Sequence, residues 1–323
     1  MAGYSFYFRG IMKKGVLAGH CAIFSANFVW GAMSPIVKYI FACGLITPLV
    51  LVSFRVAGAA LLFWILTFII GGEHVTRRDK MLFFVAAILG VVFNQGVYTI
   101  GLGLTSPVDA SVISTSTPIF TMVIAALYLR EPMTFKKVSG VFLGAAGAVM
   151  LILSGAEGGL GGNVAGNLLC IFAELCFACY LVFFKGLISR YSPLTVMKWM
   201  FTWSSVCVLP FTFRDVVAVD FSSLTIDVVL AIVFVIVFAT FLCYMLAPIG
   251  QKNLRPTVVS MYFYAQPVVS AILATIMGTA GSFGPVKILS IAMIFVGVAL
   301  VMRSKSRADI KASDNEATEP ISQ

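Results

Sequence analysis

Apolar residues occur along the chain in ten long runs, separated by short polar gaps. A helix of roughly 20 residues crosses the hydrocarbon core of a bilayer, which is about 30 Å thick. Because hydrocarbon supplies no hydrogen-bond partners, each run is expected to be a helix. The predicted spans are Val16 to Phe41, Thr47 to Ile70, Lys80 to Leu104, Pro107 to Leu129, Phe135 to Leu153, Val164 to Leu187, Pro193 to Phe213, Leu224 to Gly250, Pro256 to Met277 and Pro285 to Met302. The pattern therefore predicts an all-α polytopic membrane protein with ten transmembrane helices.

Two polar stretches within these apolar surroundings share one layout. The stretch TSPVDASVISTSTPIF contains Pro107 and Pro118, with five Ser or Thr residues between them. The stretch LRPTVVSMYFYAQPV contains Pro256 and Pro267, each 149 residues after its counterpart. Proline lacks a backbone N–H and kinks or breaks a helix. We therefore expect two matching kinkable helices, with Pro118 and Pro267 as the deeper kink positions.

A second match relates the same two halves of the chain. Trp30 with Lys38 eight residues later lines up with Phe177 and Lys185, at an offset of 147 residues. The chain is therefore interpreted as two copies of a five-helix unit. An odd number of spans inverts the second copy relative to the first, and inverted repeats are common in secondary transporters, which bind substrate near the midplane between the repeats.

A glycine-rich segment midway along the chain, GAEGGLGGNVAG, is typical of a flexible linker between the two units. The predicted organisation is an N-terminal cytoplasmic tail (1–15), a first five-helix repeat (16–153), an extracytoplasmic linker (154–163), a second five-helix repeat (164–302) and a cytoplasmic polar tail (303–323).

Composition and charge agree with a bilayer protein and give it an orientation. The chain has 60% hydrophobic and 11% charged residues, which is too little polar surface for a soluble globule of 323 residues. Of its 22 Lys and Arg residues, 17 lie in one set of alternate gaps and only three, Lys38, Arg214 and Lys287, lie in the other set. The positive-inside rule therefore predicts cytoplasmic termini and a plasma membrane location, which in a bacterium is the inner membrane. Basic residues placed in this way also argue against a nucleic-acid partner.

The repeated features resemble the EamA-type family of the drug/metabolite transporter superfamily, over about Leu17 to Met302. The most specific pieces are Trp30-Gly31 with Lys38, the stretch from Pro107 to Pro118, and Leu129-Arg130-Glu131-Pro132, which is similar to the family's acidic turn between helices four and five. The resemblance implies ten helices in two inverted five-helix repeats, and export or import of small metabolites. The equivalent turn of the second repeat lacks a carboxylate, so Glu131 is interpreted as structural.

Polar and ionisable side chains inside the spans are the default candidates for a site, because they are expected to face the bundle interior or water. Glu174 is the first of them. It lies about ten residues, or roughly 15 Å, into the sixth span, too deep for its short side chain to reach water at the surface. We expect it to couple transport to protons or to bind a substrate amine; a structural ion pair or a protonated helix contact is the alternative.

Two basic residues lie inside predicted spans. Arg55 could bind a substrate carboxylate or pair with Glu174, or it could extend to the headgroups as an anchor. Lys198 lies closer to its span end and is expected to extend to the interface. The repeat alignment places Asn27 opposite Glu174. Because Asn27 is neutral, the proposed cavity would have an acidic residue on one wall only.

The remaining candidates are polar or aromatic residues within the spans, expected to line a substrate cavity, with interhelical hydrogen bonding or interfacial anchoring as the alternatives. Asn94, Gln95 and Tyr98 are the strongest of these, because they lie deep in the third span and Tyr98 is one helical turn from Asn94. The others in the candidate set are Trp30, Ser114, Tyr180, Tyr244, Tyr262 and Gln266.

Other classes of function lack their motifs. There is no Gly-x-x-x-x-Gly-Lys-Ser/Thr loop to hold ATP phosphates. Cys176 and Cys179 have no second pair or nearby His to complete a metal site, so no metal or cofactor is expected. No Ser has a His partner within the spans, so we predict that the chain is not an enzyme. The sequence favours a secondary transporter of a small organic metabolite such as an amino acid or a related compound, and the resemblance favours export over import; a non-transporting accessory or receptor-like membrane protein is the alternative.

Overall fold

A computed structural model describes residues 2–104, 113–154, 163–276 and 284–304 of the chain. The helices of its first half are α1 (Ala2–Ala42), α2 (Pro48–Ile70), α3 (Arg77–Ala87), the π-helical segment η1 (Ile88–Val97), α4 (Tyr98–Leu104), α6 (Thr117–Tyr128) and α7 (Phe135–Ser154). Those of the second half are α8 (Val164–Phe183), α9 (Lys185–Arg190), α10 (Pro193–Val217), η2 (Phe221–Ser223), α11 (Ile226–Ile236), the π-helical segment η3 (Val237–Leu242), α12 (Cys243–Asn253), α13 (Pro256–Met261), η4 (Tyr262–Tyr264), α14 (Ala265–Ile276) and α15 (Pro285–Met302). No strand occurs within these ranges.

The predicted spans correspond closely to these helices. Within the described residues, nine helices or continuous helix combinations are long and apolar enough to cross a membrane, and Thr117–Tyr128 is a shorter apolar helix at the place of the fourth predicted span. The prediction of an all-α polytopic fold with two five-helix repeats is confirmed.

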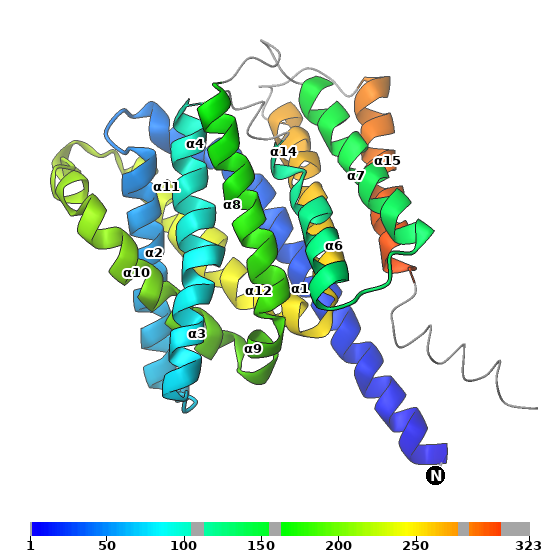
Figure 1. Ribbon diagram of the computed structural model, residues 1–323. Coiled ribbons are helices and arrows are strands. Elements are labelled where there is room, and N and C mark those ends of the chain that lie inside the picture. Colours follow the sequence, from blue (N-terminus) through cyan, green and yellow to red (C-terminus); the bar gives the residue numbers. More distant parts are fainter. Residues whose placement is uncertain (1, 105–112, 155–162, 277–283, 305–323) are drawn as a thin grey trace, which may run out of the picture.

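Basic connectors gather at one end of the bundle. The loop between α2 and α3, the loop between α6 and α7, helix α9 and the turn between α12 and α13 all lie at the lower end in Figure 1, as do the start of α1 and the end of α15. We call this the basic end, since the gaps with Arg77, Arg130, Arg190 and Arg255 are all found there.

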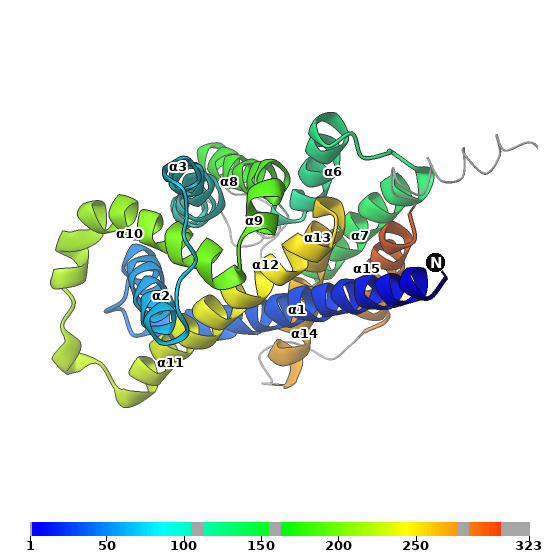
Figure 2. The same ribbon diagram turned by 90° about the horizontal axis from the view of Figure 1, so that it is seen from below.

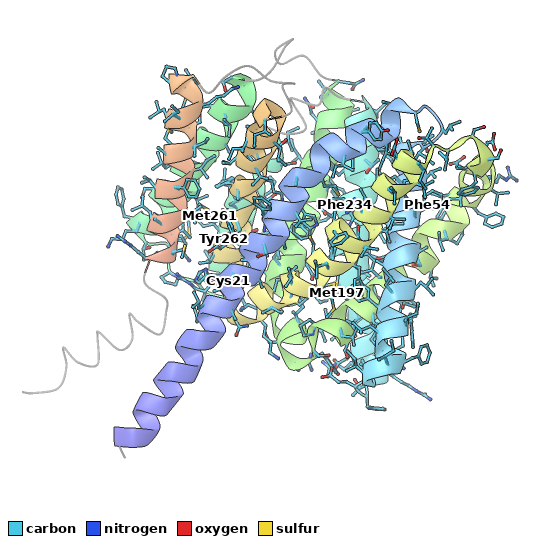
Figure 3. All side chains as sticks on the ribbon, turned by 180° about the vertical axis from the view of Figure 1, so that it is seen from behind. Cys21, Phe54, Met197, Phe234, Met261 and Tyr262 are labelled. Atoms are coloured by element: carbon cyan, nitrogen blue, oxygen red, sulfur yellow. The ribbon has the colours of Figure 1, made fainter. Side chains whose placement is uncertain are left out.

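The two halves interlock rather than lying side by side. Helix α1 of the first half packs against α12 and α14 of the second, and α8 of the second half packs against η1, α4 and α6 of the first. The pairs α2 with α10 and α7 with α15 also cross between the halves. Figure 2 shows α1 running between α12 and α14, and Figure 3 shows from behind how α1 crosses the bundle, with the labelled residues Cys21 and Tyr262 close together. Most helix contacts are therefore contacts between repeats.

Helices α7 and α15 approach closely because glycines line their contact. A Cβ added to Gly140 would lie 2.7 Å from the Gly297 carbonyl oxygen, and one added to Gly147 would lie 2.8 Å from that of Ser290. Small residues let transmembrane backbones touch in this way and gain van der Waals contact. This pair closes one side of the bundle.

The helices differ from the expected ones at three places. Helix α1 begins at Ala2, so residues expected as a tail extend the first helix at the basic end, where adding turns to an existing helix costs little. The third and eighth spans each contain a π-helical segment that the apolar pattern did not indicate. The linker residues 155–162, the tail residues 305–323 and Pro107 lie outside the described residues.

The two deeper prolines act at helix boundaries. Pro118 stands in the first turn of α6, directly after a turn at Thr115 and Ser116, where its missing N–H costs no helical hydrogen bond. Pro267 stands near the start of α14, after the 3-10 segment η4. A kink within a continuous helix was expected at both positions. At Pro118 the helix is instead interrupted: one helical stretch ends at the turn, and the next begins at the proline.

Candidate functional site

Glu174 lies on α8 and is buried, with 8% of its surface exposed. Its Oε1 accepts a hydrogen bond from the Ser114 hydroxyl at 3.0 Å, and its Oε2 accepts one from the Thr117 hydroxyl. Ser114 precedes the turn before α6 and Thr117 is the first residue of α6, so the contact joins the second half of the chain to the first. The interruption of the helix at Pro118 places both hydroxyls beside the carboxyl group.

The hydrogen-bonded chain continues from Ser114 to the third span. The Tyr98 and Ser114 hydroxyls lie 3.0 Å apart, so Glu174, Ser114 and Tyr98 form one network. Glu174 lies about ten residues from the start of α8, roughly 15 Å along the helix axis. At that depth the hydroxyls replace water as partners of the carboxyl group.

Asn27 on α1 makes the corresponding contact on the other side of the bundle. It is fully buried, its Nδ2 donates to the Ile23 carbonyl at 2.8 Å, and its Oδ1 accepts from Gln266 Nε2 of α14 at 2.8 Å. This contact also joins the two halves. Glu174 and its neighbours are thus matched by a neutral amide pair.

The offsets of the repeat explain this correspondence. Glu174 follows Asn27 by 147 residues, and Gln266 follows Thr117 by 149 residues, the offsets found for Trp30 and for the prolines. The contacts Glu174–Thr117 and Asn27–Gln266 are therefore the same contact made once by each repeat. Sequence reasoning selected three of these four residues and missed Thr117, although the proline offset applied to Gln266 points to it.

Gln95 and Tyr244 are themselves separated by 149 residues and are hydrogen-bonded to each other. Gln95 Nε2 donates to the Tyr244 hydroxyl at 2.5 Å. Gln95 lies in η1 and Tyr244 just after η3, and these π-helical segments begin at Ile88 and Val237, again 149 residues apart. Gln95 Oε1 is buried with no hydrogen-bond partner among the described residues. The centre of the bundle therefore contains one bond between equivalent positions of the two repeats.

Trp30 is held beside this bond. Its indole N–H donates to the Ala239 carbonyl of η3 at 2.8 Å, and its ring lies 5.4 Å from the Tyr244 ring and 6.1 Å from that of Phe263. A π-helical turn disturbs the regular backbone ladder, and such turns are frequent at functional sites. Phe177, the repeat counterpart of Trp30, also packs against Phe263, at 5.3 Å.

Arg55 does not meet Glu174. Its Nε donates to the Thr240 hydroxyl at 2.9 Å, and the ion pairs formed by the described residues do not include it. The suggested pairing fails because α2 packs against α10 and η3, whereas Glu174 is on α8 and faces α6. Arg55 turns inward rather than toward the headgroups, and Thr240 was not selected from the sequence.

Other sequence candidates lie apart from this centre. The Tyr180 hydroxyl donates to Gln251 Oε1 at 3.0 Å, toward the basic end, and the Tyr262 hydroxyl is 2.8 Å from His20 Nδ1. No described residue forms a hydrogen bond with the Asn94 side chain. The central group therefore consists of Glu174, Ser114, Thr117, Tyr98, Gln95, Tyr244, Trp30, Asn27, Gln266 and Arg55.

Two carboxylates at the basic end have structural partners. Glu131 forms an ion pair with buried Lys137 at 2.7 Å and accepts from the Thr257 hydroxyl at 3.1 Å. Glu73 accepts at 3.0 Å from both the Ser192 N–H and its hydroxyl at the start of α10. Desolvation raises the pKa of the Glu73 carboxyl, but hydrogen bonds from Ser192 and Thr195 outweigh it, and this pKa lies below its usual value.

The central group can hold a proton and hydrogen-bond a polar solute. A carboxyl group with two hydroxyl neighbours can accept hydrogen bonds when ionised and donate one when protonated. In the part of the chain that the structure describes, no three His, Cys, Asp or Glu side chains are grouped to hold a metal ion.

Comparison with known proteins adds a family to this geometry. The model of the EamA-like transporter family matches residues 17–153 and 164–303, once for each repeat. A protein of Archaeoglobus fulgidus named "Uncharacterized transporter" is 26% identical over 297 residues, 91% of this chain and all of that protein. "Uncharacterized transporter YyaM" of Bacillus subtilis is 26% identical over 228 residues, 70% of this chain and 72% of its own.

A solved crystal structure of a protein also has the same fold. It aligns with a TM-score of 0.73 at 19% identity, over 94% of this chain and 99% of its own. The family and the names of these relatives point to a multi-pass membrane transporter rather than an enzyme.

Proposed function

We propose that this chain, which belongs to the EamA-like transporter family, is a secondary transporter that exports a small organic metabolite, such as an amino acid or a related compound. Solute would move by alternating access between the two inverted repeats, around the central group. Glu174 would couple this movement to protons. The basic end of the protein would face the cytoplasm, and the protein would lie in the plasma membrane, which in a bacterium is the inner membrane.

One observation carries this proposal: Glu174 is a buried carboxyl group deep in a span, and its hydrogen-bond partners among the described residues are the hydroxyls of Ser114 and Thr117. A structural carboxylate in hydrocarbon would be expected to have a cation beside it. No described Lys, Arg or His forms an ion pair with Glu174. A carboxyl group with neutral partners can be protonated or ionised without stranding a buried cation.

The location of the contact supports coupling to motion. Ser114 and Thr117 belong to the first repeat and Glu174 belongs to the second. If one repeat moves relative to the other, the hydroxyls and the carboxyl group separate. Glu174 would then exchange its proton with whichever side is open, and a substrate amine could take the place of a hydroxyl.

The test uses purified protein reconstituted into vesicles. A panel of amino acids and related metabolites is screened for uptake with and without an imposed pH gradient. We expect at least one solute to accumulate only when the gradient is present. A chain that binds a solute but moves none of the panel would favour the accessory or receptor-like alternative.

The substitution Glu174→Gln then tests the coupling. Gln keeps the shape and one acceptor oxygen but cannot release a proton. We expect the variant to retain solute binding and solute exchange at equal pH and to lose accumulation driven by the pH gradient. Glu73→Gln is the matched control, because this carboxylate lies outside the spans and should not affect accumulation. Gradient-driven accumulation at the wild-type level in folded Glu174→Gln protein would refute the role of Glu174.

The orientation is tested separately with cysteine reporters in a cysteine-free chain. We expect an impermeant thiol reagent added outside whole cells to label Ser222→Cys and to leave Arg78→Cys unlabelled until the membrane is permeabilised. Labelling of Arg78→Cys in intact cells would reverse the orientation without affecting the fold.

A further inference from the structure

Two lysines share one tryptophan ring near the basic end. Lys80 Nζ of α3 lies 4.5 Å from the centre of the Trp199 ring, and Lys198 Nζ of α10 lies 5.7 Å from the same ring. Lys198 Nζ also lies 4.8 Å from the ring of Trp64 on α2. These distances are typical of cation–π contacts. We call Trp64, Lys80, Lys198 and Trp199 the tryptophan–lysine cluster.

The cluster is held in place by contacts between three helices. The Trp64 indole N–H donates to the Thr202 hydroxyl at 2.9 Å, and the Trp64 and Trp199 rings meet edge to face at 6.0 Å. One turn further along α10, the Trp203 N–H donates to the Lys80 carbonyl at 3.1 Å. The arrangement is therefore built before any ligand arrives, and Figure 2 shows α2, α3 and α10 as neighbours.

The charges of this cluster are not balanced. Neither lysine belongs to the ion pairs that the described residues form, and the nearby carboxylate, Glu73, is engaged with Ser192. Lys198 is only 4% exposed, so its charge is largely removed from water. The Trp199 indole N–H is buried with no acceptor in the described part of the chain. Two ammonium groups and a free N–H donor together favour an anion with several acceptor oxygens.

The depth of the cluster matches the headgroup region of a membrane. Lys80 lies about 5 Å from the start of α3 and Lys198 about 8 Å from the start of α10, at 1.5 Å per residue. Toward the midplane, Leu61 on the Trp64 face of α2 is 61% exposed and Val206 on the Trp199 face of α10 is 57% exposed. Polar and cationic groups thus lie directly above exposed apolar side chains.

We propose that the tryptophan–lysine cluster binds the phosphate headgroup of an anionic phospholipid in the leaflet at the basic end. Lys80, which is partly exposed, would contact the phosphate first, and Lys198 behind the same ring would add its charge. The acyl chains would lie along Leu61 and Val206. Basic pockets between transmembrane helices bind anionic headgroups, and basic residues near the membrane surface attract anionic lipids.

Tryptophan fluorescence gives a direct test, because Trp64, Trp199 and Trp203 are three of the four tryptophans in the chain. Trp30→Phe protein is reconstituted into phosphatidylcholine bilayers that contain a small fraction of brominated lipid. We expect brominated phosphatidylglycerol to quench the fluorescence at a mole fraction roughly tenfold lower than brominated phosphatidylcholine, since two lysines favour the anion.

Charge variants identify the site. Lys80→Gln with Lys198→Gln should abolish the preference for phosphatidylglycerol, whereas Lys80→Arg with Lys198→Arg should keep it. Lys136→Gln with Lys252→Gln is the matched control, because both residues are exposed at the basic end and neither lies over a tryptophan ring. Circular dichroism confirms that each variant is folded. If the Gln pair does not fold, the same charge dependence is tested with salt. High salt should remove the preference for phosphatidylglycerol in the parent protein, and the Arg pair should behave like the parent.

Three outcomes would overturn the proposal. The first is equal quenching by the two brominated lipids, and the second is an unchanged preference in folded Lys80→Gln/Lys198→Gln protein. The third is loss of the lipid preference when free glycerol phosphate is added as a competitor to the protein in neutral bilayers. That result would indicate a site for a soluble phosphate ester.

Discussion

The two copies of the central contact differ in one chemical respect. In the second repeat a carboxyl group, Glu174, faces the hydroxyls of Ser114 and Thr117. In the first repeat an amide, Asn27, faces the amide of Gln266. The repeat offset of 149 places Phe263 where the other side has Ser114, and Ala247 where it has Tyr98. One side of the bundle is thus a hydroxyl-rich acid site, and the other is an apolar site with a single amide pair.

This difference shows how a duplicated fold can separate two tasks. Both contacts join one repeat to the other, so both can stabilise the packing of the repeats. Only the Glu174 side contains a group that gains or loses a proton. Two ionisable groups in symmetric places would interact when both are charged, whereas one carboxyl group opposite an amide titrates alone.

The strongest test moves the acid to the other side. In the double variant Glu174→Gln/Asn27→Glu, the chain keeps one carboxyl group in the central contact, but this group now meets the Ile23 carbonyl and the Gln266 amide instead of two hydroxyls. We expect gradient-driven accumulation to stay at least roughly tenfold below wild type, because the hydroxyl partners of the proton are missing.

Glu174→Gln alone is the control for this double variant, and solute exchange at equal pH shows whether the protein is active. Recovery of accumulation in the double variant would mean that the two sides are interchangeable and that the hydroxyl network is not needed.

A smaller effect is expected from removing the facing partners. Thr117→Val deletes a donor to the carboxyl group, and Gln266→Leu deletes a donor to the Asn27 amide. Hydrogen bonds to charged groups contribute about 1.5–3 kcal/mol and neutral ones about 0.5–1.5 kcal/mol. Thermal unfolding in detergent at alkaline pH should therefore show the larger loss for Thr117→Val. Equal losses would indicate that Glu174 is neutral under those conditions.

The hydrogen bond between Gln95 of η1 and Tyr244 of α12 belongs neither to the Glu174 contact nor to the Asn27 contact, so it serves as a reference for both. Tyr244→Phe and Gln95→Met should each lower the free energy of unfolding by about 1 kcal/mol, and the double variant should lose little more than either single one. A double-mutant cycle on thermal stability measures this coupling. Additive losses would show that the 2.5 Å contact contributes no pairwise stabilisation.

The smallest effect concerns a carboxylate outside the membrane. The pKa of Glu73 is lowered in the folded protein, so its contribution is present above the unfolded value of about 4.3 and is lost as the pH falls through the folded value. Because Glu73 is largely exposed, Glu73→Gln should cost no more than about 0.5 kcal/mol at neutral pH. Thermal unfolding at neutral and acidic pH should show this difference shrinking in acid.

Much of the fold followed from the apolar pattern, because span length and helical backbone are dictated by the bilayer. The two-repeat organisation followed from the prolines and from Trp30. The π-helical segments η1 and η3 did not, since one extra residue in a turn barely shifts the apolar periodicity. The turn before Pro118 was also missed, because proline is compatible both with a kink inside a helix and with the first turn of a new one.

The residues of the candidate site could be predicted from the sequence only in part. Glu174, Asn27 and Gln95 stand out because such side chains are rare in hydrocarbon. Thr117 and Thr240 do not, since a hydroxyl in an apolar helix usually bonds to its own backbone. The hydroxyls of both lie within hydrogen-bonding distance of a backbone carbonyl here, that of Ser114 for Thr117 and that of Val235 for Thr240, while they also contact Glu174 and Arg55. Which hydroxyls also face a charged group depends on how α6 and η3 pack, and that information is not local.

The glycine contact between α7 and α15 is symmetric between the two repeats. Gly140 touches Gly297 and Gly147 touches Ser290; with an offset of 150 residues, each of these contacts is the symmetry mate of the other. This reciprocal pattern is the signature of an isologous interface, the kind that two identical subunits form about a two-fold axis. The two repeats therefore meet at this seam in the way that two identical subunits meet at a two-fold axis.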